Sequence, residues 1–231
     1  MFTGIVQEMG KIVARAEVAR VSDLHPGQAV RFSIEAPLVA PRLNIGDSVA
    51  CDGVCLTVET LIRNSAEVVT GFTVCAVPET LAKTTLDLWA VGGVINLETA
   101  LTAATPLGGH FVLGHADGVA EVVEVNALGS AGESGREVTV RLPAEFLPFC
   151  VYKGSITLSG VSLTIAAVEE DRIRVALIPH TLEVTTLGLA VPRGRVNFEV
   201  DILAKHIERQ LSLRSIGSAP ALKPEGGHGI P

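Results

Sequence analysis

Aromatic side chains are scarce in this sequence, which has one Trp, one Tyr and seven Phe among its 231 residues. Any hydrophobic core must therefore be filled mainly by Val, Leu, Ile and Ala, and apolar residues are plentiful enough for this at 48% of the chain. No stretch is long and apolar enough to span a bilayer. Phe2 and Thr3 follow Met1 without the basic region and apolar run of a signal peptide. We therefore expect a cytoplasmic protein.

Positive charge is also limited, because 18 Lys and Arg residues against 25 Asp and Glu residues give a formal net charge of −7. Without a basic cluster, nucleic acid and anionic membrane surfaces are not expected as partners. The four cysteines lack a metal-ligand spacing, since Cys51 and Cys55 have no second pair and no nearby His. The sequence thus predicts no metal site and thiols that stay reduced.

The most informative feature that is present is a repeat. Residues 53–58 read GVCLTV and residues 160–165 read GVSLTI, about half a chain apart. In the same order, residues 78–86 (PETLAKTTL) return as 179–187 (PHTLEVTTL), residues 95–98 (INLE) return as 196–199 (VNFE), and residues 1–6 return more faintly as 110–115. We therefore predict two tandem domains of about 100 residues, an ordinary size for one core, at 1–104 and 105–201.

The local pattern favours an all-β fold. Short runs rich in Val, Ile and Thr, such as 29–34 and 173–177, alternate with Gly, Pro, Asn and Asp. This spacing is typical of small antiparallel barrels rather than βαβ units, and it predicts about six strands in each copy. Two short helices per copy are expected, one at 36–40 or 143–147 and one starting at the repeated Pro-x-Thr-Leu segment.

The C-terminal part lies outside the repeat. Residues 202–214 are predicted to form a helix, because Leu203, Ile207 and Leu211 make a narrow apolar stripe at helical spacing. Such a stripe either packs on a barrel or joins subunits, and we favour an oligomerisation helix. Residues 215–231 are rich in Gly and Pro and are predicted to be disordered.

The two copies differ at positions of chemical interest. Different groups on similar scaffolds suit two sites for similar molecules, as in a reaction where two copies of one substrate take different roles. Ordinary drift after duplication is the alternative for every pair. The pairs are Cys55 with Ser162, Ile5 with His115, Gly46 with Lys153, Glu79 with His180, and Ala100 with Asp201.

Each candidate also has a structural interpretation. Cys55 could fill a small apolar space, and His115 could be a hydrogen-bonded surface residue. Thr57 and Thr164 could be ordinary β-branched strand residues. Lys153 could be a solvated turn residue and Asp201 a helix N-cap.

The MFTGIV start, the GVCLTV motif, the paired P-x-T-L-x-x-T-T-L blocks, and residues 108–110 (GGH) with Gly114 and His115 resemble riboflavin synthases over about residues 1–213. The resemblance implies two six-stranded antiparallel Greek-key barrels and a C-terminal helix that joins three chains. Each barrel would bind one 6,7-dimethyl-8-ribityllumazine, and the N-terminal barrel of one subunit would face the C-terminal barrel of another. One lumazine would donate a four-carbon unit to the other, giving riboflavin and 5-amino-6-(D-ribitylamino)uracil without a metal or organic cofactor. An assembly with lumazine synthase is left open.

The same resemblance assigns binding residues to two pockets, in which backbone groups would read the pyrimidine edge and the hydroxyls of Thr57 and Thr164 would add hydrogen bonds. The first pocket would be lined by Gly4, Ile5, Val6, Cys55, Leu56, Thr57, Cys75, Ala76, Val77, Pro78, Glu79 and Thr80, with Gly114, His115 and Ala116 as a further ligand-contacting stretch. The second pocket would be lined by Lys153, Ser162, Leu163, Thr164, Leu177, Ile178, Pro179, His180 and Thr181.

Five residues carry predicted catalytic roles. Cys55, or a water beside it, would add to the acceptor lumazine, and His115 would help to move protons from the acidic C7 methyl group. Ser162 and Asp201 would hold the donor, and Phe2 would anchor the N-terminal strand across the site. The protein would further supply proximity of the two rings and stabilise negative charge on them.

Departures from the family pattern are few. Val54 stands where some members carry a second Cys, and His180 stands where others have Glu. The main alternative is a non-catalytic lumazine- or flavin-binding antenna protein, which would keep one pocket and lose reactive groups in the other. A structural protein made of duplicated barrels would need none of these groups.

Overall fold

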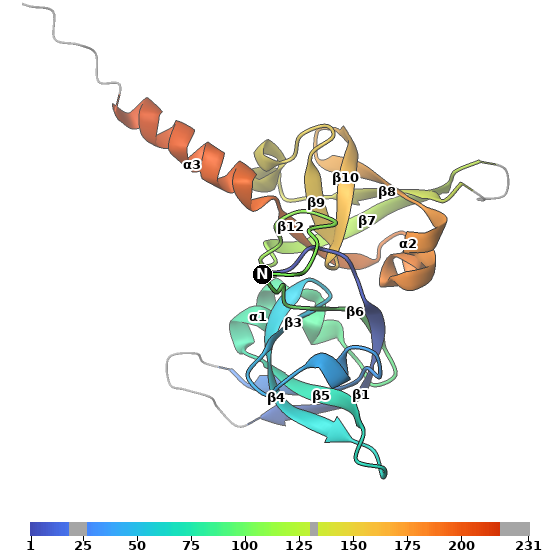
Figure 1. Cartoon of the computed structure of the whole chain (residues 1–231). Helices are drawn as coiled ribbons and strands as arrows, with labels where there is room; N and C mark the ends of the chain where they lie inside the picture. The colour runs from blue at the N-terminus through green and yellow to red at the C-terminus, as the bar shows by residue number, and fades with distance from the viewer. Residues whose placement is uncertain (19–26, 130–133, 218–231) are drawn as a thin grey trace, which may run out of the picture.

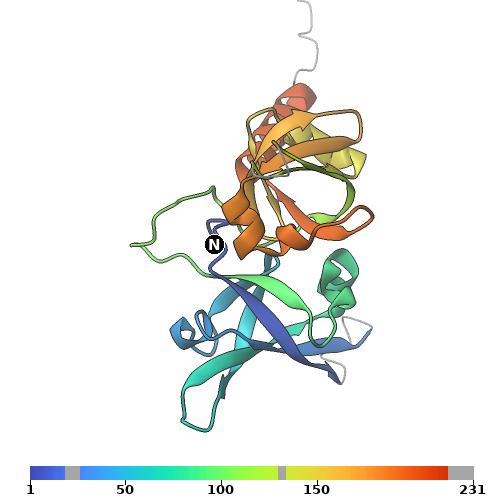
Figure 2. The same ribbon diagram turned by 90° about the vertical axis from the view of Figure 1, so that its right-hand side faces the viewer.

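The computed structural model describes residues 1–18, 27–129 and 134–217, and two β-barrels lie one above the other in both views (Figures 1 and 2). The first barrel closes in the order β1-β2-β5-β4-β3-β6, with every neighbouring pair antiparallel. Its strands are β1 (Glu8–Val18), β2 (Ala29–Glu35), β3 (Ser48–Cys51), β4 (Val54–Arg63), β5 (Val69–Ala76) and β6 (Val94–Thr99).

The second barrel repeats this connectivity, closing as β10-β11-β8-β7-β12-β9. Its strands are β7 (Gly118–Ala127), β8 (Arg136–Arg141), β9 (Ser155–Leu158), β10 (Val161–Val168), β11 (Arg172–Leu177) and β12 (Arg195–Val200). The predicted pair of six-stranded antiparallel Greek-key barrels is therefore confirmed. Residues 100–110 connect the barrels without a strand or helix.

The repeated GVxLT motif has the alternation of a half-buried strand. In β4 the side chains of Val54, Leu56 and Val58 are buried in the first core, whereas Cys55 and Thr57 lie on the outer face. The matching positions of β10 behave in the same way, and Ser162 and Thr164 lie on the outer face of the second barrel. The chemically distinctive positions of both copies thus face away from the barrel interiors.

Short helices close the gaps between strands, as expected. The repeated Pro-x-Thr-Leu blocks form α1 (Pro78–Lys83) and α2 (Pro179–Val184), each beginning with Pro at the first helical position. Each then turns into a 3-10 helix, η2 (Thr85–Leu88) or η5 (Thr186–Leu189), whose first turn is capped by a Thr hydroxyl. The helix expected at 143–147 is the 3-10 segment η4 (Ala144–Phe149). The helix expected at 36–40 is displaced, because residues 37–39 form a turn and the 3-10 segment η1 (Ala40–Arg42) follows it.

The two barrels meet across an internal pseudo-two-fold arrangement. The Asn96 side-chain amide donates to the Ser159 carbonyl at 2.8 Å, and the Asn197 amide donates to the Asp52 carbonyl at 2.9 Å. Gly53 and Gly160 touch at the centre, where a Cβ on Gly53 would lie 2.6 Å from the Gly160 nitrogen. The repeated Gly and Asn residues are thus explained by a junction that uses the same contact twice.

The C-terminal helix α3 (Ile202–Gly217) begins where the sequence predicts and extends away from the second barrel (Figure 1). It continues beyond residue 214 because the chain has no Gly or Pro before Gly217. The prediction that residues 215–217 are disordered is therefore wrong, and residues 218–231 lie outside the described residues. No helix among the described residues is long and apolar enough to cross a membrane.

Candidate functional site

The first candidate site surrounds Cys55 on the outer face of β4. A hollow of about 240 Å³ opens there, formed by the first barrel and by a segment that precedes β7 of the second. It brings together seven of the residues expected in the first pocket: Cys55, Val77, Glu79, Thr80, Gly114, His115 and Ala116. His115 is exposed at its edge.

Gly114 is held tightly against Cys55. The Cys55 backbone N–H donates to the Gly114 carbonyl at 2.7 Å. A Cβ on Gly114 would lie 2.8 Å from the Cys55 Cβ, and its φ of +76° is itself a conformation that favours glycine. The buried carboxylate of Glu199 accepts hydrogen bonds from the Leu113 and Gly114 N–H groups at 2.8 and 2.9 Å and fixes this segment.

The second candidate site is built in the same way around Ser162. The Ser162 backbone N–H donates to the Gly4 carbonyl at 2.7 Å, and Gly4 has a φ of +77°. The buried carboxylate of Glu98 accepts hydrogen bonds from the N–H groups of Thr3 and Gly4 at 2.7 and 2.9 Å. Burial raises the pKa of both Glu98 and Glu199, while the backbone hydrogen bonds oppose this shift.

This geometry corrects one expectation. Gly4, Ile5 and Val6 were expected in the pocket of the first barrel, but Gly4 lies on Ser162 and Val6 packs against the core of the second barrel. The physical reason is an exchange between the copies, because the segment before each barrel lies against the GVxLT strand of the other. An isolated bridge between Phe2 and Val112, with N···O distances of 2.7 and 3.1 Å, joins the two exchanged segments.

The second site contains a group that sequence reasoning did not select. The Nδ1 atom of His110 lies 2.7 Å from the Ser162 Oγ, and the His110 N–H donates to the Thr3 carbonyl. Burial lowers the pKa of His110, and the negative charge of Asp201 acts in the opposite direction. A neutral imidazole can accept the Ser162 hydroxyl proton, so this pair can serve as a base or a proton relay.

The repeat itself concealed His110. The bridge between Phe2 and Val112 and the equivalent glycines Gly4 and Gly114 set the register of the two copies. The faint match of residues 1–6 to 110–115 is therefore displaced by one position, and His110 falls just before the repeated segment. The neighbouring Gly108-Gly109-His110 sequence was the available signal, because Gly109 leaves no room for a side chain beside Ser162.

Several predicted binding residues can offer only their main chain. The side chains of Leu56, Leu163, Ala76 and Leu177 are buried in the barrel cores. Cys75 lies on the outer face of β5, where burial raises the pKa of its thiol and the Glu59 charge adds to this rise. Pro78 is half-buried, whereas Ile178, Pro179 and His180 are exposed and Thr181 is half-buried at the start of α2.

Three other predicted residues have mainly structural surroundings. Phe2 is completely buried between the barrels, so it can position the site but cannot touch a ligand with its ring. Asp201 caps α3 by accepting from the Leu203 N–H at 2.9 Å. Lys153 is an exposed turn residue with a φ of +65°, and its Nζ lies 5.1 Å from the centre of the Tyr152 ring. Within the described chain, none of its contacts reaches Ser162.

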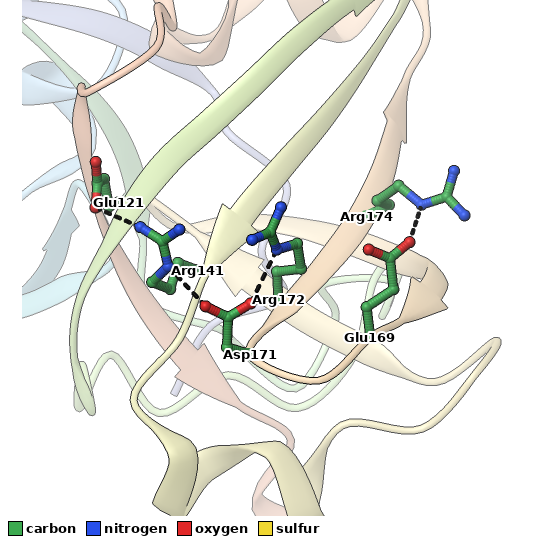
Figure 3. Close-up of polar contacts among 6 residues, drawn as sticks. All are labelled: Glu121, Arg141, Glu169, Asp171, Arg172 and Arg174. Atoms are coloured by element: carbon green, nitrogen blue, oxygen red, sulfur yellow. Dashed lines mark hydrogen bonds and ion pairs between the residues drawn. The ribbon is translucent and has the colours of Figure 1, made fainter.

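The outer face of the second barrel carries a set of ion pairs (Figure 3). Arg141 pairs with Glu121 at 3.0 Å and with Asp171 at 2.8 Å, and Asp171 also pairs with Arg172 at 2.9 Å. Hydrogen bonds from Arg172 and Arg141 lower the pKa of Asp171. Arg174 Nε lies 3.2 Å from Glu169 (Figure 3).

The first barrel has a sparser arrangement, in which Arg31 on β2 pairs with Glu59 on β4 at 2.6 Å. The outer faces of the two barrels are thus built from equivalent strands but carry different ion pairs. No group of three His, Cys, Asp or Glu side chains in the described ranges is arranged to hold a metal ion.

Comparison with known proteins identifies the class to which these tandem barrels belong. A family model described as the lumazine binding domain matches residues 3–100 and again residues 113–201. The crystal structure of LumP complexed with riboflavin superimposes with a TM-score of 0.73, covering 87% of this chain and 99% of that one, and its 23% identity bears on the fold alone.

Curated relatives narrow this class. The riboflavin synthase of Mycobacterium tuberculosis (strain ATCC 25618 / H37Rv) is 39% identical over 220 residues, which cover 94% of this chain and all of the relative. That of Brucella abortus (strain 2308) is 41% identical over 209 residues, which cover 90% of this chain and 97% of the relative. The chain belongs to the riboflavin synthase family, and like these relatives it is an enzyme.

Proposed function

We propose that the enzyme converts two molecules of 6,7-dimethyl-8-ribityllumazine into riboflavin and 5-amino-6-(D-ribitylamino)uracil by transfer of a four-carbon unit. The products together contain all the atoms of the two substrates, so the reaction needs no oxidant and no second reactant. The observation that carries the proposal is the pair of equivalent outward-facing sites, which present the Cys55 thiol in one copy and the Ser162 hydroxyl in the other.

The first site holds the acceptor lumazine in this proposal. Cys55, or a water beside it, adds to the acceptor ring, and His115 at the edge of the hollow moves protons from the C7 methyl group. Backbone groups of the segments 75–80 and 114–116 bind the ring edge. The segment 114–116 can lie against Cys55 because residue 114 is glycine; a larger residue at this position would push the segment away from Cys55.

The donor lumazine occupies the second site, on Ser162. The His110 Nδ1 lies 2.7 Å from the Ser162 hydroxyl oxygen, and burial favours the neutral imidazole by lowering its pKa. Ser162 can therefore take a proton from the C7 methyl group or a ring nitrogen while its own proton passes to His110. Asp201 contributes its charge to this pair and, through its cap, connects the site to α3.

The complete active site forms between subunits in this proposal, with the first barrel of one chain facing the second barrel of another in a homotrimer. Leu203, Ile207 and Leu211 of α3 are 54%, 60% and 55% exposed, so the apolar stripe is not covered by the barrels of its own chain. Leu211 and Ile207 line a hollow of about 380 Å³ together with Phe149 and Val151. A neighbouring helix could fill this hollow and join the subunits.

The decisive experiment mixes the purified chain with 6,7-dimethyl-8-ribityllumazine, without metal or cofactor, and follows riboflavin. One riboflavin per two lumazines consumed is the expected result. Binding of lumazine without riboflavin formation would instead support the antenna function, for which the likeness to LumP is the relevant observation.

Sedimentation of the chain, alone and with lumazine synthase, tests the proposed trimer and the wider assembly. Cell fractionation tests the proposed localisation in the cytoplasm.

A further inference from the structure

A third hollow, of about 640 Å³, lies at the junction of the two barrels. None of the residues predicted to bind substrate lines it. Its volume falls within the range of small-molecule sites, roughly 300–1,000 Å³, and domain junctions are common places for such sites. The first barrel contributes Asp52, Leu88 and Trp89, and the second contributes Leu189, Arg193 and Arg195.

The walls of this hollow are apolar and open to solvent. Leu88, Leu189 and Val191 are 59%, 66% and 60% exposed although all three line one concave surface. Isolated exposed apolar side chains are normal, but several around one hollow indicate a surface that binds something. These side chains would shield the flat, apolar part of a ligand from water.

Two cationic side chains line the hollow. Arg193 and Arg195 both line it, and no carboxylate of the described residues forms an ion pair with either. Glu121, which lies opposite Arg195 in the β7–β12 pairing, is already engaged by Arg141 at 3.0 Å (Figure 3). Two guanidinium groups that form no ion pair with a described carboxylate therefore remain available to an anion.

The first copy shows that these arginines are not needed for the fold. Gly92 and Val94 occupy the equivalent positions, and the Gly92 N–H donates to the Ile12 carbonyl just as the Arg193 N–H donates to the Val122 carbonyl. Arg193 adopts a φ of +68°, a conformation that favours glycine. The second copy thus places a cationic side chain where the scaffold would accept glycine.

We propose that this junction hollow binds a small organic anion with a flat apolar body. The anionic group contacts Arg193 and Arg195, and the body lies against Leu88, Leu189 and Val191. Ser159, Thr186 and Asp52 line the same hollow, where the Thr186 hydroxyl accepts from the Asn96 side-chain amide and the Asp52 carboxyl accepts from the Asn96 N–H, each at 2.8 Å. Because both barrels line the hollow, an occupant also ties them together.

The test uses 8-anilinonaphthalene-1-sulfonate, a fluorescent aromatic anion, with the full chain. Fluorescence should rise to saturation at one probe per chain and weaken with added salt. The double variant Arg193→Gly with Arg195→Val, which restores the residues of the first copy, should lose about tenfold or more in probe affinity. Its thermal stability should not fall, because glycine relieves the left-handed conformation.

Two controls keep the assignment specific. The uncharged N-phenyl-1-naphthylamine should bind the double variant and the original chain alike, and Arg42→Gln, a change elsewhere on the surface, should leave sulfonate affinity unchanged. Equal sulfonate affinity in the double variant would overturn the proposal. So would displacement of the sulfonate by saturating lumazine, because the probe would then occupy the substrate sites.

Discussion

In the first barrel, the GVxLT strand presents the Cys55 thiol on its outer face, in a hollow that has the exposed His115 at its edge. In the second barrel this strand presents the Ser162 hydroxyl, which is hydrogen-bonded to the buried ring of His110. The residues that join the barrels are by contrast the same in both copies, as Gly53 with Gly160 and Asn96 with Asn197 show. The duplication has kept the junction and changed the chemistry placed beside it.

This difference separates two physical constraints. A junction in which each copy contacts the other through the same atoms cannot accept a change on one side without loss on both. A site on an outer face can change one side chain at a time, because the barrel core behind it is unaffected. Substitutions at the junction should therefore cost stability, and substitutions at the sites should cost turnover.

The largest effect is expected at the centre of the junction. Gly53→Ala places a Cβ 2.6 Å from the Gly160 nitrogen and forces alanine into a φ of +79°. We expect the free energy of unfolding to fall by about 3 kcal/mol or more, from overpacking and backbone strain together. Denaturant unfolding measures this loss.

Gly46→Ala is the matched control. Its φ is +90°, but nothing lies within 4 Å of the added Cβ. It should therefore cost only the backbone strain of about 1–2 kcal/mol. Equal losses in the two variants would show that the close approach of Gly53 and Gly160 contributes nothing.

The next effect concerns a junction position that the copies do not share, Asp52 against Ser159. Burial raises the pKa of Asp52 from 3.8 to about 7, although hydrogen bonds from Asn96, Trp89 and Thr186 oppose it. The unfolded chain releases this proton near pH 4 and the folded chain only near pH 7. Stability contributed by the protonated acid is therefore fully present below about pH 4 and is lost as the pH rises through 7.

Asp52→Asn removes this titration while suiting the φ of +46°. The variant should gain on the order of 3 kcal/mol over the original chain at pH 8 and little at pH 4. Unfolding curves across this pH range measure the difference. An unchanged pH dependence in the variant would exclude Asp52 as its source.

Turnover should distinguish the two outward-facing sites. Ser162→Ala removes the partner of His110 and should lower kcat by about 100-fold, a typical loss for assisted proton transfer. The exchanged double variant, Cys55→Ser with Ser162→Cys, keeps one thiol and one hydroxyl at these two positions. It should also remain slow, because His110 lies only beside position 162. Full activity of the exchanged enzyme would mean that the sites are interchangeable.

Much of this organisation could be predicted from the sequence, because it is repeated. The barrels, their short helices and the distinctive pair of Cys55 and Ser162 all follow from matching one half of the chain to the other. The sequence could not predict that the segment before each barrel contacts the other barrel. A repeat shows which residues are equivalent, but it does not show which barrel each segment contacts. Gly4 was thus expected beside Cys55 and lies on Ser162. His110 has no counterpart in the first copy at all, so comparing the copies could not reveal it.

The smallest expected effect tests the role of His110, which the sequence did not predict. Burial lowers the pKa of His110 from its ordinary value, so the ring stays neutral and able to accept from Ser162 to a lower pH than an exposed histidine. Activity that depends on the neutral ring should therefore be lost only in acid, at a lower pH than an ordinary histidine would give. His110→Asn should remove this acidic limb of the rate profile, whereas His115→Gln should lower the rate and leave the limb in place.

Asp201 offers a finer control on the same limb. Its charge raises the pKa of His110 against the effect of burial, and its side chain also caps α3. Asp201→Asn removes the charge but keeps a good N-cap, so the helix should be preserved. The acidic limb should then move to still lower pH, by a fraction of a pH unit. A limb that stays in place, or moves upward, would mean that the titrating group in turnover is not His110.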